Sequence, residues 1–183
     1  MLADLTVKDF LDKVACSDPV PGGGSIAALN GAIASALAAM VANLTIGKKG
    51  YELHEELMRH VSGVALQQKG AFVEDIDRDS EAYNKVFACF KMPKATDEEK
   101  AARSAAIQEA TKFAALVPMQ VARNRMSLMT VIMDIARMGN RNAVTDACVA
   151  MMSARSAVLG ALMNVRINLG FVEGQGVCVQ APK

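Results

Sequence analysis

Apolar residues recur every three or four positions through most of this chain, which is the spacing of one face of an α-helix. The clearest stripe predicts a helix from about residue 54 to residue 90, and its members are Met58, Val61, Ala65, Phe72, Ile76, Tyr83, Phe87 and Phe90. Similar segments predict helices at about 6–16, 25–47, 97–138 and 143–169. The sequence therefore predicts an all-α protein, a single bundle of about five helices of which two are long.

Local sequences mark where these helices begin and end. Thr6 to Asp9 and Thr96 to Glu99 each match a capping box, in which the threonine and the acidic side chain bond the backbone N–H groups that open a helix. Gly47 is expected to end the second helix. Pro118 is expected to kink the fourth, because a proline inside a helix removes one backbone hydrogen bond. The short connections make neighbouring helices mostly antiparallel.

The composition supports this fold class and argues against some functions. Hydrophobic residues make up 52% of the chain, only 4% is aromatic and there is no Trp, which favours closely spaced helices. The net charge of +1 is too balanced for a protein that coats nucleic acid, so we expect no nucleic-acid partner. We expect one domain over residues 1–183, in which 170–183 form an irregular tail.

One uncharged segment, residues 26–46, is nearly long enough to cross a bilayer. Its apolar residues are mostly Ala and it contains Asn30 and Asn43, so we interpret it as a buried core helix and expect no membrane contact. The N-terminus lacks a basic leader followed by an apolar run, and we expect a cytoplasmic protein. His54 and His60 have no cysteine or carboxylate at metal-ligand spacing, so we expect no metal.

Asp79 is a candidate site residue because it lies three residues after Ile76 and four before Tyr83, at the edge of the apolar stripe. A carboxylate in such a position is costly to bury unless it is paired. It is therefore either part of a site or an ion-pair partner of Arg78 or of a neighbouring helix, and spacing alone leaves both open. Asp77, considered alone, is interpreted as a surface residue.

The last helix carries a second set of polar residues on one face: Asp146, Ser153, Asn164 and Asn168. Small residues lie between them, which leaves room for a flat ligand, and carboxylate and amide groups suit hydrogen bonding to a heteroaromatic ring. A polar seam between packed helices would give the same pattern, so both interpretations stay open.

Gly23, Gly24 and Ser25 precede the Ala-rich helix, where unpaired backbone N–H groups at the helix start can bind an anion or a polarised carbonyl. Glycines that only allow tight packing are the commoner explanation. Lys48 and Lys49 follow the same helix, where they cap its C-terminal end or bind a carboxylate.

Several motifs together resemble one family: Pro19 to Ser25, Gly47 to Lys49, Asp77 to Asp79 with Ala82 and Tyr83, Lys91 to Lys94, Val117 with Pro118, Gly139 to Asn142 with Asp146, and Asn164 to Asn168. In this order they resemble the cyclodeaminase domain of formiminotransferase-cyclodeaminase and its stand-alone methenyltetrahydrofolate cyclohydrolase relatives. The resemblance runs from about residue 5 to residue 169. Thr145 stands where the family usually has Ser, a departure that keeps the hydroxyl.

The resemblance implies a five-helix fold, a homodimer or larger homo-oligomer, and a tetrahydrofolate substrate carrying one carbon at N5 or N10. It also implies no metal, no nucleotide and no tightly bound cofactor. Both family reactions pass through a cationic carbon, which needs a base and a nearby anion. We expect Asp79 to supply one or both, with Asp77 second and Asp146 as an anchor or proton relay.

Substrate-binding positions follow from the same resemblance. We expect Asn164, Asn168 and the backbone of Gly23, Gly24 and Ser25 to hold the pterin, and Lys48 or Lys49 to receive the glutamate. Asn140 completes this predicted set.

Three functions remain open from the sequence. Cyclodeamination and cyclohydrolysis are not separated by it, although the lack of an attached transferase segment leans slightly to cyclohydrolysis; a separate formiminotransferase partner would restore cyclodeamination. The third is a noncatalytic helical dimerisation or scaffold module, in which buried Asp and Asn side chains only fix helix register.

Overall fold

The computed structural model describes residues 1–124 and 126–170, which contain six α-helices and no strand. The helices are α1 (Val7–Val14), α2 (Gly23–Asn43), α3 (Glu55–Phe90), α4 (Asp97–Asn124), α5 (Met126–Met138) and α6 (Val144–Leu169). Single 3-10 turns lie at Leu2–Asp4, Glu52–His54 and Arg141–Ala143. The predicted all-α class is confirmed, and the sixth helix arises because the predicted segment 97–138 is two helices, α4 and α5.

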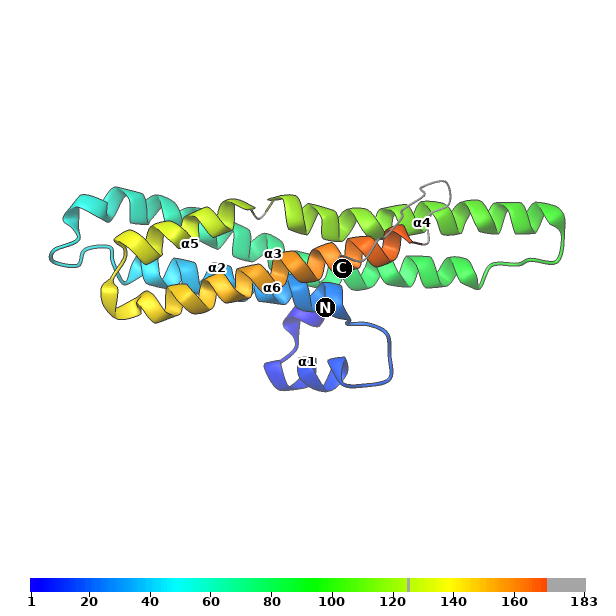
Figure 1. The fold of residues 1–183 in the computed structure, drawn as a ribbon. Coiled ribbons are helices and arrows are strands. Elements are labelled where there is room, and N and C mark those ends of the chain that lie inside the picture. The colour runs from blue at the N-terminus through cyan, green and yellow to red at the C-terminus, as the bar shows by residue number, and fades with distance from the viewer. Residues whose placement is uncertain (125, 171–183) are drawn as a thin grey trace, which may run out of the picture.

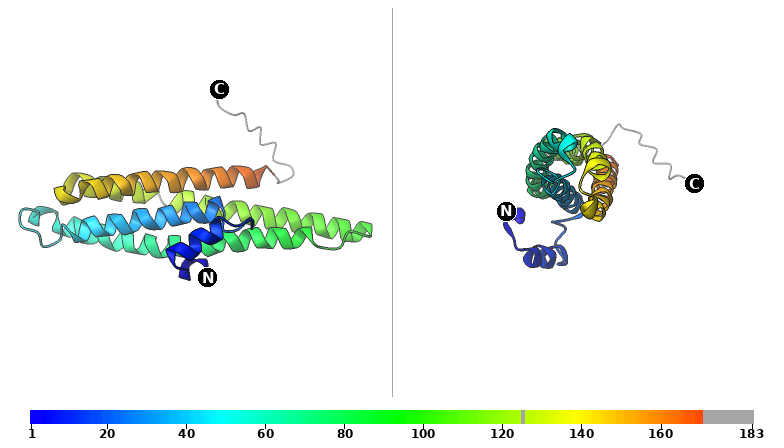
Figure 2. Two further views of the ribbon diagram at one scale, coloured as in Figure 1. Left: turned by 90° about the horizontal axis from the view of Figure 1, so that it is seen from below. Right: turned by 90° about the vertical axis from the view of Figure 1, so that its left-hand side faces the viewer.

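The bundle is elongated, with α2 packed along α3 and α6, and α4 and α5 following one another along the other side (Figure 1). The end-on view in Figure 2 shows the long helices around a common axis, with α1 outside it. The C-terminal end of α3 and the N-terminal end of α4 lie side by side and extend past the start of α2 (Figure 1). This arrangement leaves the last turns of α3 without cover from α2.

Small side chains allow α2 and α6 to pack closely. The buried face of α6 is almost entirely alanine, namely Ala147, Ala150, Ala154, Ala157 and Ala161 with Val165. On α2, Gly31 leaves space that the Phe72 ring fills, since a Cβ at Gly31 would overlap that ring. Phe72 is fully buried. Close contacts between helix backbones therefore fill the core as much as large side chains do.

Both predicted capping boxes are present. The Thr6 hydroxyl accepts the Asp9 N–H at 3.1 Å, and the Thr96 hydroxyl accepts the Glu99 N–H at 3.2 Å. The α2 helix ends at Asn43, four residues before Gly47, and a turn with Gly47 at φ 70° completes the connection. The chain stays helical through Pro118, and the boundary between α4 and α5 falls at residue 125, outside the described residues. The tail predicted for 170–183 lies outside them from residue 171 onward.

The apolar stripe predicted for α3 is only partly buried. Met58, Val61, Ala65, Phe72 and Ile76 are buried, as expected, whereas Tyr83, Phe87 and Phe90 are 40%, 47% and 51% exposed. The reason is the position of α2, whose first residues lie opposite Asp79. Beyond that point α3 packs against α4 and borders a cavity that the end of α6 also lines.

Two helical segments are long and apolar enough to cross a membrane, by length and composition alone. In the first, Gly23–Asn43, 61% of the apolar window is buried inside the bundle, in agreement with the prediction of a core helix. In the second, Arg141–Leu169, only 28% is buried. The apolar face of α6 is thus partly uncovered.

Candidate functional site

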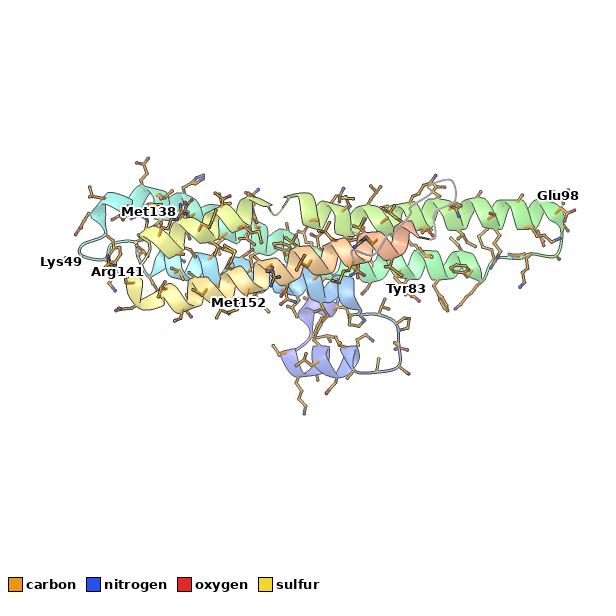
Figure 3. All side chains as sticks on the ribbon, viewed as in Figure 1. Lys49, Tyr83, Glu98, Met138, Arg141 and Met152 are labelled. Carbon is orange, nitrogen blue, oxygen red and sulfur yellow. The ribbon has the colours of Figure 1, made fainter. Side chains whose placement is uncertain are left out.

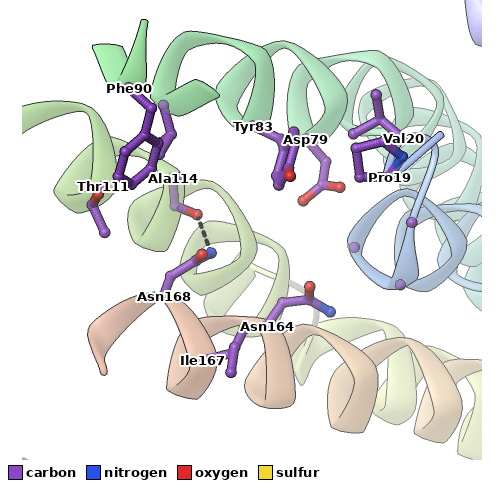
Figure 4. Close-up of a pocket in the computed structure, with 14 residues that line it drawn as sticks. Pro19, Val20, Asp79, Tyr83, Phe90, Thr111, Ala114, Asn164, Ile167 and Asn168 are labelled. Atoms are coloured by element: carbon purple, nitrogen blue, oxygen red, sulfur yellow. Dashed lines mark hydrogen bonds between the residues drawn. The ribbon is translucent and has the colours of Figure 1, made fainter. Parts of the chain in front are cut away.

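A cavity of about 400 Å³ opens where the start of α2 meets α3, α4 and the end of α6 (Figure 4). Its lining residues are Pro19, Val20, Gly22, Gly23, Gly24, Asp79, Tyr83, Val86, Phe90, Thr111, Ala114, Asn164, Ile167 and Asn168. The uncovered end of α3 forms one long wall. The cavity is therefore a consequence of α2 beginning where it does.

Asp79 lies at the edge of this cavity, directly against the first turn of α2. A Cβ on Gly24 would overlap the Asp79 carboxylate, so only glycine allows the two helices this approach. The Ser25 hydroxyl donates to the Ile76 carbonyl oxygen at 2.9 Å and lies 3.2 Å from Asp79 Oδ2 and 3.1 Å from the Ser80 hydroxyl. The glycine-rich start of α2 thus positions the carboxylate.

Burial raises the pKa of Asp79 above its ordinary value, since removal from water disfavours the charged form. The hydroxyl and backbone N–H of Ser25 oppose this change by hydrogen bonding to the carboxylate, and the nearby charge of Asp75 adds to it. Asp79 is therefore a half-buried acid whose proton affinity is increased, a property that is common among residues of functional sites.

The amides of Asn164 and Asn168 come from α6 to the opposite wall. Figure 4 shows Asn164 pointing into the space below Asp79. Its Nδ2 donates to the Gly160 carbonyl of its own helix at 2.9 Å, which leaves its oxygen as an acceptor. Asn168 donates to the Ala114 carbonyl at 2.9 Å and so ties α6 to α4. The structure brings both amides into one cavity with Asp79.

Of the predicted glycine-rich segment, Gly23 and Gly24 line the cavity, but Ser25 does not. Ser25 is fully buried and its hydroxyl contacts Asp79, Ser80 and the Ile76 carbonyl. Ser25 therefore lies on the side of Asp79 that faces away from the cavity, where it contacts the carboxylate and not the cavity.

Most of the apolar lining of this cavity was not predicted from the sequence. Tyr83, Val86 and Phe90 follow Asp79 by four, seven and eleven residues, which is the spacing of one helix face. Tyr83 and Phe90 were interpreted as part of an apolar core stripe, and Val86 was not singled out. Thr111 and Ile167 gave no comparable indication.

Asp77 does not reach this cavity. Its carboxylate accepts the backbone N–H of Leu2 at 2.5 Å and that of Ala3 at 3.3 Å, which holds the N-terminal 3-10 turn against α3. Asp146 lies in the first turn of α6, at the other end of that helix from Asn164. Neither of these carboxylates lines the cavity with Asp79.

The remaining predicted residues lie at the opposite end of the bundle. Lys48 Nζ donates to Asn140 Oδ1 at 2.9 Å, and Asn140 also bonds the Thr45 hydroxyl and the Leu44 carbonyl. Lys49 is exposed at that same end, far from Tyr83 (Figure 3). Since α2 has 21 residues, the two ends are about 30 Å apart.

A second cavity of about 350 Å³ lies at that end, lined by Gly50, Tyr51, His54, Arg137, Met138, Gly139 and Arg141. Within residues 1–124 and 126–170, no group of three or more His, Cys, Asp or Glu side chains could hold a metal ion.

Comparison with known proteins gives a family for this arrangement. The formiminotransferase-cyclodeaminase family model matches residues 6–181. A methenyltetrahydrofolate cyclohydrolase from Methylorubrum extorquens is 41% identical over 92% of this chain and 81% of its own length. The formimidoyltransferase-cyclodeaminase of Rattus norvegicus is 32% identical over 92% of this chain, which corresponds to 31% of the rat protein.

A solved structure agrees with these matches. The crystal structure of formiminotetrahydrofolate cyclodeaminase from Thermotoga maritima has a TM-score of 0.83 and 33% sequence identity, covering 95% of this chain and 83% of that one. The resemblance inferred from the ordered motifs is confirmed. This chain belongs to the formiminotransferase-cyclodeaminase family and is an enzyme of its folate cyclodeaminase and methenyltetrahydrofolate cyclohydrolase group.

Proposed function

We propose that the cavity around Asp79 binds 5,10-methenyltetrahydrofolate and that the protein hydrolyses it to 10-formyltetrahydrofolate. The observation that carries this proposal is a half-buried carboxylate with a raised pKa, held by Gly24 and Ser25 at the wall of a cavity large enough for a flat ring. The similarity to a cyclohydrolase over 81% of that protein's length supports the choice of reaction.

In this proposal the Asp79 carboxylate first stabilises the positive charge shared by N5, N10 and the carbon between them. It then accepts a proton from a water molecule as the water oxygen bonds to that carbon. The bond from the carbon to N5 breaks as N5 takes the proton that Asp79 accepted, the remaining hydroxyl proton is lost to solvent, and a formyl group is left on N10. The net change is the uptake of one water and the release of one proton.

The other lining groups suit the binding of a folate. The Asn164 and Asn168 amides can hydrogen-bond the polar edge of a pterin, and Gly23 leaves space for its ring. Tyr83, Val86 and Ile167 offer an apolar surface for the benzoyl ring. We therefore place the pterin at the α2 end of the cavity and the rest of the substrate along α3.

Cyclodeamination is the second candidate, supported by the likeness to the T. maritima cyclodeaminase. Here N10 of 5-formiminotetrahydrofolate attacks the formimino carbon and ammonia leaves, so the same carboxylate would stabilise the same cation. A separate formiminotransferase would then be a partner, because it supplies that substrate.

We also propose that two copies of the chain associate through the uncovered face of α6. The exposed apolar residues of this face are Val149, Met152, Leu159, Met163 and Ile167. Contiguous exposed apolar surface of this kind commonly marks a protein interface. Ile167 also lines the cavity, so a partner on this face would border the substrate.

Two assays on the purified protein test the reaction. The decay of methenyltetrahydrofolate absorbance measures hydrolysis, and ammonia release from 5-formiminotetrahydrofolate measures cyclodeamination. We expect hydrolysis above the uncatalysed rate, and its loss in Asp79→Asn. Activity in the ammonia assay alone would select the second candidate, and no activity in either would overturn the proposed reaction.

A further inference from the structure

The lysines predicted to bind the substrate's glutamate lie at the opposite end of the bundle from Asp79. Lys48 and Lys49 lie about 30 Å from Asp79, with α2 and its tightly packed alanines between them. A reduced folate whose reactive carbon lies beside Asp79 has only a benzoyl ring and an amide before its glutamate, roughly the length of three extended residues, or about 10 Å. Within one chain, the glutamate of a substrate bound at Asp79 is therefore out of reach of Lys48 and Lys49.

The cavity itself gives the direction in which the tail would leave. It follows α3 from Asp79 to Phe90, eleven residues along one helix face, which is about 16 Å. Gly23, Gly24 and Pro19 close the α2 end of the cavity, while Phe90 and Thr111 lie at the other end (Figure 4). A substrate with its pterin at the α2 end extends toward Phe90.

A cation lies just beyond this end of the cavity. The Arg103 guanidinium is stacked on Phe90, with Cζ 5.7 Å from the ring centroid, and its Nη2 and Nε donate to the Phe90 carbonyl at 3.1 and 3.4 Å. Phe90 thus holds the side chain through its ring and through its carbonyl. The Phe90 carbonyl belongs to the C-terminal end of α3, which carries only a partial negative charge, and a guanidinium has further N–H donors to offer.

Nearby acidic residues are engaged elsewhere. Asp97 pairs with Lys100 at 2.8 Å, and Glu99 accepts the backbone N–H groups of Ala95 and Thr96. The pKa of Glu98 is lowered by its own backbone N–H and the Thr96 hydroxyl. In the described part of the chain, no carboxylate lies within ion-pair distance of Arg103. Lys91, with Nζ 4.6 Å from the Phe87 ring centroid, adds a second cation at the end of α3.

We propose that Arg103 binds a carboxylate of the substrate's glutamate, and that Lys91 adds affinity when further glutamates extend the tail. This inference rests on the proposed folate site, and it names the part of the molecule that recognises the tail. Arg103 is a binding residue here and takes no part in bond breaking. Its replacement raises KM and leaves kcat unchanged.

The test compares two substrates that differ only in the glutamate: methenyltetrahydrofolate and methenyltetrahydropteroate. In Arg103→Gln we expect KM for the first to rise about tenfold or more, as for loss of a charge-assisted hydrogen bond. KM for the second stays unchanged, and Arg103→Lys partly restores binding. Lys112→Gln, nine residues along α4 and exposed, makes the same change of charge on the opposite face and leaves both KM values unchanged.

An equal rise of both KM values in Arg103→Gln, or no rise in either, would overturn the inference. If the wild-type protein turns over neither substrate, the proposed reaction fails, and the inference is then tested by calorimetry with 5-formyltetrahydrofolate and 5-formyltetrahydropteroate. Tighter binding of the glutamate-bearing ligand that disappears in Arg103→Gln supports it. Equal binding of the two ligands, or no binding of either, contradicts it.

Discussion

Gly24 of α2 and Asp79 of α3 lie so close together that a methyl group on Gly24 would overlap the Asp79 carboxylate. This contact joins the two elements that define the cavity, the start of α2 and the uncovered end of α3. It holds the candidate base between a helix N-terminus and open space. The position of the acid therefore depends on a residue that carries no functional group.

Gly24→Ala is expected to displace the Asp79 side chain while the bundle stays folded. A displacement of about 1 Å at a reacting group can lower the rate by about 10²-fold, and we expect a loss of kcat of that order. Gly63→Ala is the matched control on α3, where a Cβ meets nothing within 4 Å. It should keep kcat and gain about 0.5–1 kcal/mol in unfolding free energy. Equal kcat in the two variants would contradict the role given to Gly24.

Asp79→Asn should separate activity from stability. Loss of the base predicts a fall in kcat of about 10²–10⁴-fold. The raised pKa of Asp79 means that the folded protein binds its proton more tightly than the unfolded chain does, so the ionised carboxylate disfavours folding at neutral pH. The variant should therefore have the higher Tm at pH 7.

The Tm difference between Asp79→Asn and wild type should depend on pH in a definite direction. This difference should shrink as pH falls through the raised pKa, and vanish below the ordinary aspartate pKa, where the carboxyl is protonated in both states. Glu81→Gln, at an exposed position two residues along, is the control. A wild-type protein more stable than Asp79→Asn at pH 7 would show that Asp79 acts mainly as a cap for α2.

Asp77→Ala tests whether the second predicted carboxylate is structural. Its removal leaves the Leu2 and Ala3 N–H groups without their acceptor, which should cost about 1 kcal/mol and expose the N-terminal turn to limited proteolysis. We expect kcat to change little. If turnover is lost while the N-terminus stays protected from protease, Asp77 takes part in the reaction.

The sequence predicted best what depends on neighbouring residues. In the capping boxes at Thr6 and Thr96, each hydroxyl bonds a residue only three positions later, so the sequence identifies both partners. The period of apolar residues likewise locates the long helix without knowledge of the rest of the fold. The exposure of Phe90, by contrast, depends on where α2 begins relative to α3. That relation is set by packing between distant segments.

The same limit explains the site residues that the structure separates. Asp146 and Asn164 share a face of α6 because eighteen residues complete five turns, but the same eighteen residues place them about 27 Å apart along the axis. Angular position shows which side chains face one neighbour, and it carries no information on whether one ligand can reach both. Asp79 and Asn164 meet because α3 and α6 converge at the start of α2.

Self-association through α6 is tested by charge on its exposed face. Met152 and Met163 are 61% and 66% exposed and eleven residues apart, so they point in nearly the same direction without contributing to the core. Met152→Glu with Met163→Glu should shift the mass measured by light scattering from two chains to one, because a carboxylate is costly to bury in an apolar interface. Met133→Glu, at an exposed position on α5, is the control. Since Ile167 lies on both this face and the cavity, the double variant should also raise KM, and a monomeric wild-type protein would refute the proposed interface.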